Sequence, residues 1–334
     1  MTPRARLIGI AAAACLVAIL LFLPLGLNTY GLFILSMWAV MSIAAMGLNL
    51  TLGYAGQVSL AQGAFVGIGA YTAALLTING YSLALAFAAA ALLCFAVGWL
   101  LGYPALRVQH HYLAFVTLAF STLAYLVFRN EEWLTKGIYG ISGVPRPAAL
   151  GIDLAKPLPF YYFCLAILAV VVVAVWWLVK SPWGRAFVAI RENPLRARSL
   201  GVNTSRYTLL AFAIGSGLGG IAGALYAPLV EFVDPSPFTL LLSLNLLMMV
   251  IVGGSGYFAG PLLGAIIAVL LPEWLRAIQS YYLILYALLV MAILMWSPTG
   301  ILGIADAWLE RRRSIARSRA LAEKTPTLAS GEDA

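Results

Sequence analysis

The sequence predicts an all-α protein that crosses a membrane about ten times. Composition is the first reason: 63% of the 334 residues are hydrophobic and only 10% are charged, whereas soluble domains are about half apolar and a quarter charged. The second reason is that apolar runs recur along the whole chain, most of them near the roughly 20 residues that a spanning helix needs. These runs are continuous and do not alternate with polar residues, which excludes a membrane β-barrel.

Ten apolar segments account for the predicted spans. In chain order they are residues 7–27, 31–52, 58–78, 82–101, 111–128, 158–179, 207–230, 238–252, 257–272 and 281–297. The first could pass for a signal peptide, but apolar residues continue beyond Cys15, so a spanning helix that stays attached is favoured. The eighth and ninth are short and share the sequence "GGSGY", so they can form a re-entrant pair that lowers the count to eight.

The distribution of Lys and Arg orients these helices. With ten spans and the N-terminus inside, 15 of the 20 basic residues fall on the inner side, including those of a loop at 180–206 and a basic, disordered tail at 306–334. Basic flanks resist translocation, so both termini are predicted to be cytoplasmic. Residues 1–305 then form one membrane domain, whose longest outer loop covers residues 129–158. The net charge of +8 indicates this topology and contact with anionic lipid, not a nucleic-acid partner.

Motifs for catalysis are weak or missing. The sequence has no G-x-x-x-x-G-K-[ST] phosphate loop, so the chain does not hydrolyse ATP by that route. "GGSG" around Ser255 resembles the serine motif of intramembrane proteases, but His110 and His111 lie at a predicted helix end and supply no buried base. The three cysteines lack the spacing of metal ligands. We therefore predict no catalytic residue, no bound metal and no cofactor.

The predicted spans contain glycines and neutral polar residues but no charges. "GSGLGG" matches a dinucleotide fingerprint, yet no strand precedes it; Gly215, Gly219 and Gly223 recur every four residues and predict close packing of helix backbones. Buried charges mark proton-driven carriers, so their absence argues against that class. A carrier with a sodium site of carbonyls and hydroxyls, or a passive channel, stays open as an alternative.

Neutral polar side chains form the candidate translocation path. Buried amides need partners or a cavity, and a lining of this kind suits a small polar solute that is not held tightly. Hydrogen bonding between helices explains each residue equally well when taken singly. The candidates are Asn49, Gln57, Ser59, Gln62, Thr117, Ser121 and Asn245. At helical spacing Gly56, Ser59, Gly63, Gly67 and Ala70 would share one helix face.

The loop at 180–206 is a basic island between apolar runs. Trp183, Phe187 and Ile190 fall at helical spacing, Asn193-Pro194 predicts an N-cap followed by proline at the first position of a second helix, and Gly201 ends that helix. Leu195 and Leu200 continue an apolar side. The island could lie on anionic lipid, or it could be a coupling element that sits in a groove of a cytoplasmic partner. The candidate coupling residues are Arg191, Glu192, Asn193, Pro194, Arg196 and Gly201.

Four stretches of the chain resemble the LivM-type membrane subunits of bacterial branched-chain amino-acid ABC importers. They are "GLNLTLGYAGQVSLAQGAFVGIGAYTAALL", "PALRVQHHYLAFVTLAF", "SPWGRAFVAIRENPLRARSLGVNTSRYTLLAFAIGSGLGGIAGALYA" and "VGGSGYFAGPLLGAIIAVLLPEWLR", and the similarity covers roughly residues 30–305. The resemblance implies a permease in the bacterial inner membrane, about ten helices with an inverted repeat, and a periplasmic loop at 129–158. The implied partners are a homologous second permease, two cytoplasmic ATP-binding subunits and a periplasmic binding protein.

The resemblance also assigns roles. The island would contact the ATP-binding subunit, with Glu192, Ala197 and Gly201 in the place of the "EAA" loop of permeases. ATP-driven closure would then move the island as a lever, and glycine-rich helices with hinge residues Gly253, Gly254 and Gly256 would open the path to one side at a time.

Two departures leave the substrate open. Gln62 stands where the family pattern has histidine, and "LTKGIYGISGVP" replaces a glycine-rich stretch. Urea, short amides and aromatic acids therefore stay beside leucine, isoleucine and valine as candidates.

Overall fold

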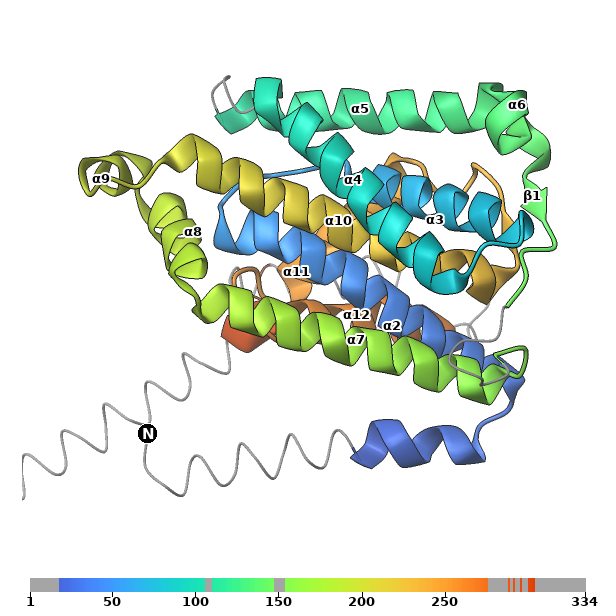
Figure 1. Cartoon of the computed structure of the whole chain (residues 1–334). Helices are drawn as coiled ribbons and strands as arrows, with labels where there is room; N and C mark the ends of the chain where they lie inside the picture. Colours follow the sequence, from blue (N-terminus) through green and yellow to red (C-terminus); the bar gives the residue numbers. More distant parts are fainter. Residues whose placement is uncertain are drawn as a thin grey trace, which may run out of the picture.

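The computed structural model describes residues 18–105, 110–146 and 154–275, together with 288, 291, 295 and 300–303. Helices dominate these ranges (Figure 1). The helices are α2 (Thr29–Asn49), α3 (Gln62–Ile78), α4 (Leu83–Ala105), α5 (His110–Asn130), α6 (Glu132–Thr135), α7 (Pro157–Lys180), α8 (Pro182–Glu192), α9 (Pro194–Ser199), α10 (Thr204–Val230), α11 (Leu240–Gly253) and α12 (Gly260–Leu275). The structure also contains the short helices η1 (Leu23–Gly26), η2 (Leu50–Tyr54) and η3 (Gly137–Tyr139).

Five of the described helices are long and apolar enough to cross a membrane: α2 with η2, α4, α5, α7 and α10. The apolar helices α3, α11 and α12 are shorter. The chain is therefore an all-α, multi-pass membrane protein. Most of the predicted spans at 7–27 and 281–297, both termini and the tail at 306–334 lie outside the described residues, so the count of ten stays a prediction.

Helix α10 forms the centre of the bundle and packs against α2, α3 and α4. Its glycines at four-residue spacing lie against α2 and α3. A Cβ atom added at Gly215 would lie 2.6 Å from the carbonyl oxygen of Gly47 in α2, and one at Gly219 would lie 3.0 Å from Cβ of Phe65 in α3. One at Gly223 would lie 2.6 Å from the backbone nitrogen of Ala70 in α3. The small-residue stripe is thus the seam along which these helices approach.

The third predicted span is broken. Helix α2 continues as the π-helical turn η2 to Tyr54, residues 55–61 are not helical, and α3 begins only at Gln62. The prediction of a continuous helix from residue 58 is wrong, and Gly56 and Ser59 do not share a helix face with Gly63. Gly56 has φ of +70°, which a right-handed helix does not accommodate. The hydroxyl of Thr117 in α5 accepts a hydrogen bond from the Leu60 N–H at 3.0 Å, which holds the segment away from helical pairing.

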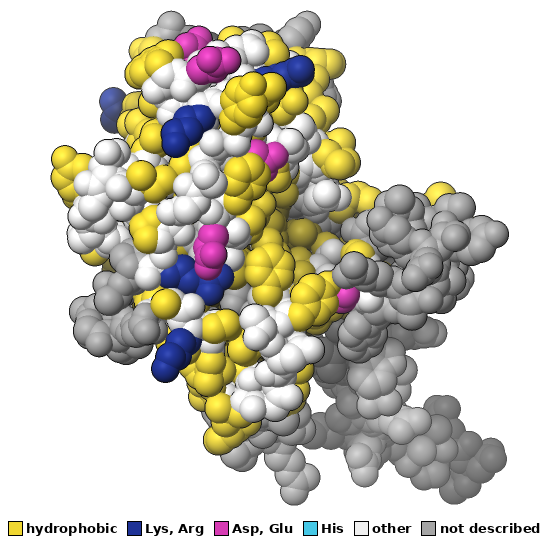
Figure 2. Space-filling view, turned by 90° about the vertical axis from the view of Figure 1, so that its right-hand side faces the viewer, with side chains coloured by type: hydrophobic (Ala, Val, Ile, Leu, Met, Phe, Trp, Pro, Cys, Tyr) yellow, Lys and Arg dark blue, Asp and Glu magenta, His cyan; other side chains and the backbone are white. Residues whose placement is uncertain are grey.

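The end of the bundle opposite α8 and α9 carries an ordered cap, at the right of Figure 1. It contains α6, η3 and the strand β1 (Ile141–Ser142), which pairs antiparallel with β2 (Phe232–Val233) just after α10. Figure 2 looks onto this end, where acidic and basic side chains are interspersed with hydrophobic ones. The predicted outer loop is therefore structured over its described residues.

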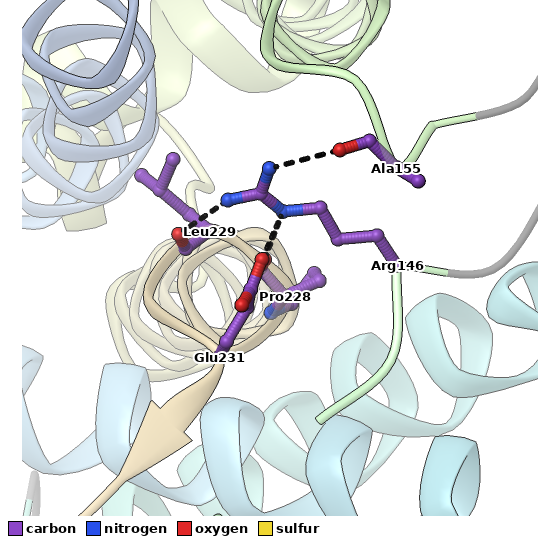
Figure 3. A network of polar contacts seen from close by, with 5 residues as sticks. All are labelled: Arg146, Ala155, Pro228, Leu229 and Glu231. Carbon is purple, nitrogen blue, oxygen red and sulfur yellow. Dashed lines mark hydrogen bonds and ion pairs between the residues drawn. The ribbon is translucent and has the colours of Figure 1, made fainter. Parts of the chain in front are cut away.

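Arg146 fastens the cap to α10 (Figure 3). Its guanidinium donates from Nε to the Pro228 carbonyl at 2.9 Å and from Nη2 to the Leu229 carbonyl at 3.1 Å, and it pairs with Glu231 at 3.0 Å. A third donor reaches the Ala155 carbonyl at 3.4 Å. Carbonyls in the last turn of a helix lack intrahelical partners and carry partial negative charge, so a cation there stabilises the helix end.

Candidate coupling site at the α8 end of the bundle

The basic island folds as the two short helices that the sequence predicts. Ser181 caps α8 by accepting a hydrogen bond from the Trp183 N–H at 3.1 Å, with Pro182 in the first turn. Asn193 caps α9, because its Oδ1 accepts from the N–H groups of Leu195 and Arg196 at 3.1 and 3.0 Å. Gly201, with φ of +83°, follows the end of α9. Proline at the first position and two side-chain caps fix where each helix starts.

One face of α8 is anchored to the bundle. Phe187 is fully buried against Leu50, Tyr54 and Ala211, and its ring meets that of Tyr207 edge-on at 6.4 Å. Ile190 is buried as well. Helical spacing also predicts Trp183 on this face, but the Trp183 side chain is half exposed. The buried face of α8 instead consists of Gly184, Phe187 and Ile190. This face is buried because α8 turns sharply after α7, and Gly184 lies against the Val179 backbone at this corner. Phe187 thus packs α8 against the end of α2.

Arg191, at the end of α8, reaches both interruptions of the membrane helices. Its Nη1 donates a hydrogen bond to the Gly53 carbonyl in η2. A Cβ atom added at Gly56, in the non-helical segment, would lie 3.0 Å from Arg191 Cγ, and one added at Gly256 would clash with the guanidinium. The side chain thus lies between the α2–α3 break and the turn that joins α11 to α12.

Asn49, at the end of α2, connects that helix end to the turn between α11 and α12 from within the bundle. Its Oδ1 accepts a hydrogen bond from the Gly256 N–H at 2.9 Å, and its Nδ2 donates to the Tyr257 carbonyl at 3.0 Å. The side chain is buried. Gly254 and Gly256 have φ of +117° and +82°, which explains why glycine occupies this turn. We call Asn49, Gly53, Arg191 and Gly256 the junction.

The other face of the island is open. Leu195 and Leu200 are 75% and 81% exposed, and Glu192 and Arg196 beside them are exposed too. Ala197 is buried. Arg198 donates from Nε to the Thr204 hydroxyl at 2.9 Å, which holds α9 to the start of α10. Leu195 and Leu200 thus leave an apolar edge of the island uncovered among charged side chains.

The candidate path residues lie at several places in the described bundle. Gln62 is buried, and its amide nitrogen donates to the Ala44 carbonyl in α2 at 3.0 Å and the Gly215 carbonyl in α10 at 3.1 Å. Ser59 and Thr117 lie at the same break, and Gln57 donates to the Ala55 carbonyl at 3.4 Å. Ser121 is buried on α5, and Asn245 is exposed on α11. Asn49 belongs to the junction.

The family comparison agrees with this architecture. A family model described as the permease component of a branched-chain amino acid transport system matches residues 30–295. The chain belongs to this permease family. No solved structure matches the chain.

Relatives of this permease match it over most of its length. The chain is 32% identical over 299 residues to the high-affinity branched-chain amino acid permease protein LivM of Escherichia coli K12, covering 82% of the chain and 70% of the relative. It is 31% identical over 308 residues to LivM of Salmonella typhimurium LT2, covering 85% and 72%. It is 29% identical over 268 residues to the autoinducer 2 import permease LsrC of Salmonella typhi, covering 76% and 75%.

Sequence reasoning missed two contacts of this permease. Ser243 in α11 accepts a hydrogen bond from the Gly63 N–H at 2.9 Å, which joins α11 to the start of α3. The sequence signal that could have indicated this contact was the position of Ser243 beside Asn245, in a group of polar residues. The role of Arg146 had no local signal, because its partners at the end of α10 lie more than 80 residues away in the sequence.

Proposed function

We propose that this chain is the membrane-spanning permease subunit of an ATP-driven importer of branched-chain amino acids. Membership of the family and the names of the relatives support the substrate class. The observation that carries the mechanism is the junction, where one arginine of the exposed basic island contacts both interruptions of the membrane helices.

The proposed assembly has two permeases, two ATP-binding subunits and an external binding protein. The excess of Lys and Arg on the island supports a cytoplasmic α8 end, where the ATP-binding subunits would lie beneath α8 and α9. The cap would then face the periplasm and receive the binding protein. Ten helices with an inverted repeat, cytoplasmic termini and a bacterial inner membrane complete the proposal.

In the proposed mechanism α8 acts as a lever. Leu195 and Leu200 would enter an apolar groove of the ATP-binding subunit, while Glu192 and Arg196 pair with its charges. Closure of the ATP-binding subunits would displace α8, and the buried Phe187 would carry this motion to the end of α2. Through Arg191 the same displacement would reach the glycine turn between α11 and α12, so that both interruptions change together.

Uptake of radiolabelled leucine by proteoliposomes that hold all the proposed subunits tests this function. We expect uptake to require ATP and every partner. Arg196→Ala and Glu192→Ala should assemble but hydrolyse ATP with reduced uptake. Lys156→Ala, which also removes one exposed charge but lies just before α7, outside both the cap and the island, is the matched control and should leave the ratio of uptake to hydrolysis unchanged.

Two outcomes would redirect the assignment. Stimulated ATP hydrolysis without leucine uptake would point to urea, short amides or aromatic acids. Equilibration of solute by this chain alone, without ATP, would refute the coupling role and support an ion-coupled carrier or channel.

A further inference from the structure

Helix α3 begins deep within the bundle. Gln62, its first residue, donates its amide to the carbonyl of Ala44, which lies ten residues before the end of the α2 and η2 helix at Tyr54. At 1.5 Å per residue this places the start of α3 about 15 Å from the α8 end of that helix. The bond from Gln62 to Gly215, near the middle of α10, agrees with this depth. Residues 55–61 therefore descend to mid-bundle without helical structure, as the trace between α2 and α3 in Figure 1 shows.

Part of this descending segment has an unpaired backbone. Among the described residues, the carbonyl oxygens of residues 56–60 accept no hydrogen bond, and the N–H groups of Val58 and Ser59 donate none. The neighbouring N–H groups are paired: Gln57 N–H donates to the Thr51 carbonyl at 2.9 Å, and Leu60 N–H donates to the Thr117 hydroxyl. We call residues 56–60 the open backbone strip.

Unpaired backbone groups at this depth need polar surroundings. Peptide groups in the hydrocarbon region are not left unpaired; non-helical backbone occurs there only where it is covered by protein or lines a water-filled cavity. The strip is not sealed by the rest of the chain, since Val58 is 41% exposed. The segment between residues 44 and 64 contains no acidic or basic residue, and Arg191 from α8 lies against its start at Gly56.

A hollow elsewhere in the described chain has the opposite character. It has a volume of about 600 Å³ between α4, α7 and α10, and its walls include Phe87, Phe163 and Val170. Apart from Ser82, the residues that line it are apolar. Such a hollow suits an acyl chain and offers nothing to a zwitterion.

We propose that the open backbone strip lines the translocation path and gives transient hydrogen bonds to the transported amino acid. Its carbonyl oxygens would accept from the α-ammonium group, and the N–H groups of Val58 and Ser59 would donate to the α-carboxylate. Neutral dipoles bind both charges without a fixed opposite charge, so the solute is released again readily. The inference rests on the proposed function. It assigns the polar contacts with the amino acid to the main chain of the strip and not to the side chains of Gln57 and Gln62.

Cysteine labelling in the complete transporter tests the strip. Cys15, Cys94 and Cys164 are first replaced, and Val58→Cys is compared with Val170→Cys, a position on α7 that is 65% exposed at the apolar hollow. A charged, membrane-impermeant methanethiosulfonate reacts with the thiolate, which forms in water but not in lipid. We expect Val58→Cys to react at least about tenfold faster, since each unit of thiol pKa changes the thiolate fraction tenfold. Leucine and its binding protein should slow the reaction.

Each of the other possible results contradicts one part of the inference. Equal rates at the two positions would mean that lipid or the second permease covers the strip. Fast labelling that leucine does not slow would refute contact with the amino acid. ATP-dependent leucine uptake measured in the same vesicles separates these failures from failure of the proposed function.

A second variant keeps the test independent of cysteine chemistry. Val58→Trp adds bulk at the opening of the strip, so we expect uptake to fall at least about tenfold while ATP hydrolysis continues. Val170→Trp is the matched control. Normal uptake by an assembled Val58→Trp transporter would overturn the inference.

Discussion

Replacing Asn49 by alanine should loosen the turn between α11 and α12. The side chain makes two hydrogen bonds, from Gly256 N–H at 2.9 Å and to the Tyr257 carbonyl at 3.0 Å. A hydrogen bond in a folded protein contributes about 0.5–1.5 kcal/mol net, so the pair contributes about 1–3 kcal/mol. Opening of the turn should then become about 5- to 150-fold more frequent.

Hydrogen–deuterium exchange of the purified chain in lipid nanodiscs measures this directly. The Gly256 N–H is protected by Asn49 itself, so the peptide that contains it should exchange faster in Asn49→Ala by that factor. Asn79→Ala is the matched control, because it removes an exposed amide that donates to the Leu75 carbonyl at 2.7 Å at the far end of α3. Equal exchange at Gly256 in the wild type and Asn49→Ala would refute the role of Asn49 in holding the turn.

Three further predictions concern the stability of the bundle, measured by thermal denaturation in detergent. Gly223→Ala should cost about 1–3 kcal/mol, because its Cβ would meet the α3 backbone, whereas Gly217→Ala, with its nearest neighbour at 3.4 Å, should be tolerated. Gln62→Leu should cost about 1–3 kcal/mol through the loss of two bonds between helices, and an unchanged midpoint would contradict this role. Arg146→Ala should destabilise more than Glu231→Ala, because the half-exposed ion pair contributes little beside the two bonds to the end of α10; equal effects would refute that order.

Periodicity and capping rules predict a helix correctly where the sequence of that segment alone determines its structure. The Asn193 side chain caps α9, and the ring of Pro194 fixes the backbone of its first residue. Both residues are local to this helix start, so the two-helix island was predictable. The glycines at four-residue spacing likewise indicated a packing face before the facing backbones were known.

The α2–α3 break and the junction depend on contacts that no local pattern contains. Residues 58–78 are apolar enough to be taken for one helix, and only the partners Thr117 and Ala44 fix where it starts. Arg191 was predicted to face a partner because it lies in a basic loop. Its reach to Gly53 depends on α8 folding back against the end of α2, which a loop sequence does not encode by itself.

The seam of α10 also constrains how this sequence can diverge. At Gly215 and Gly223 the facing groups are backbone atoms of α2 and α3, which cannot change with the side chain. A larger residue at either position therefore has no compensating substitution across the interface and requires the two helices to separate. Variation among functional relatives should accordingly gather on the outward surfaces of α4, α5 and α7, and the seam should change slowest of all.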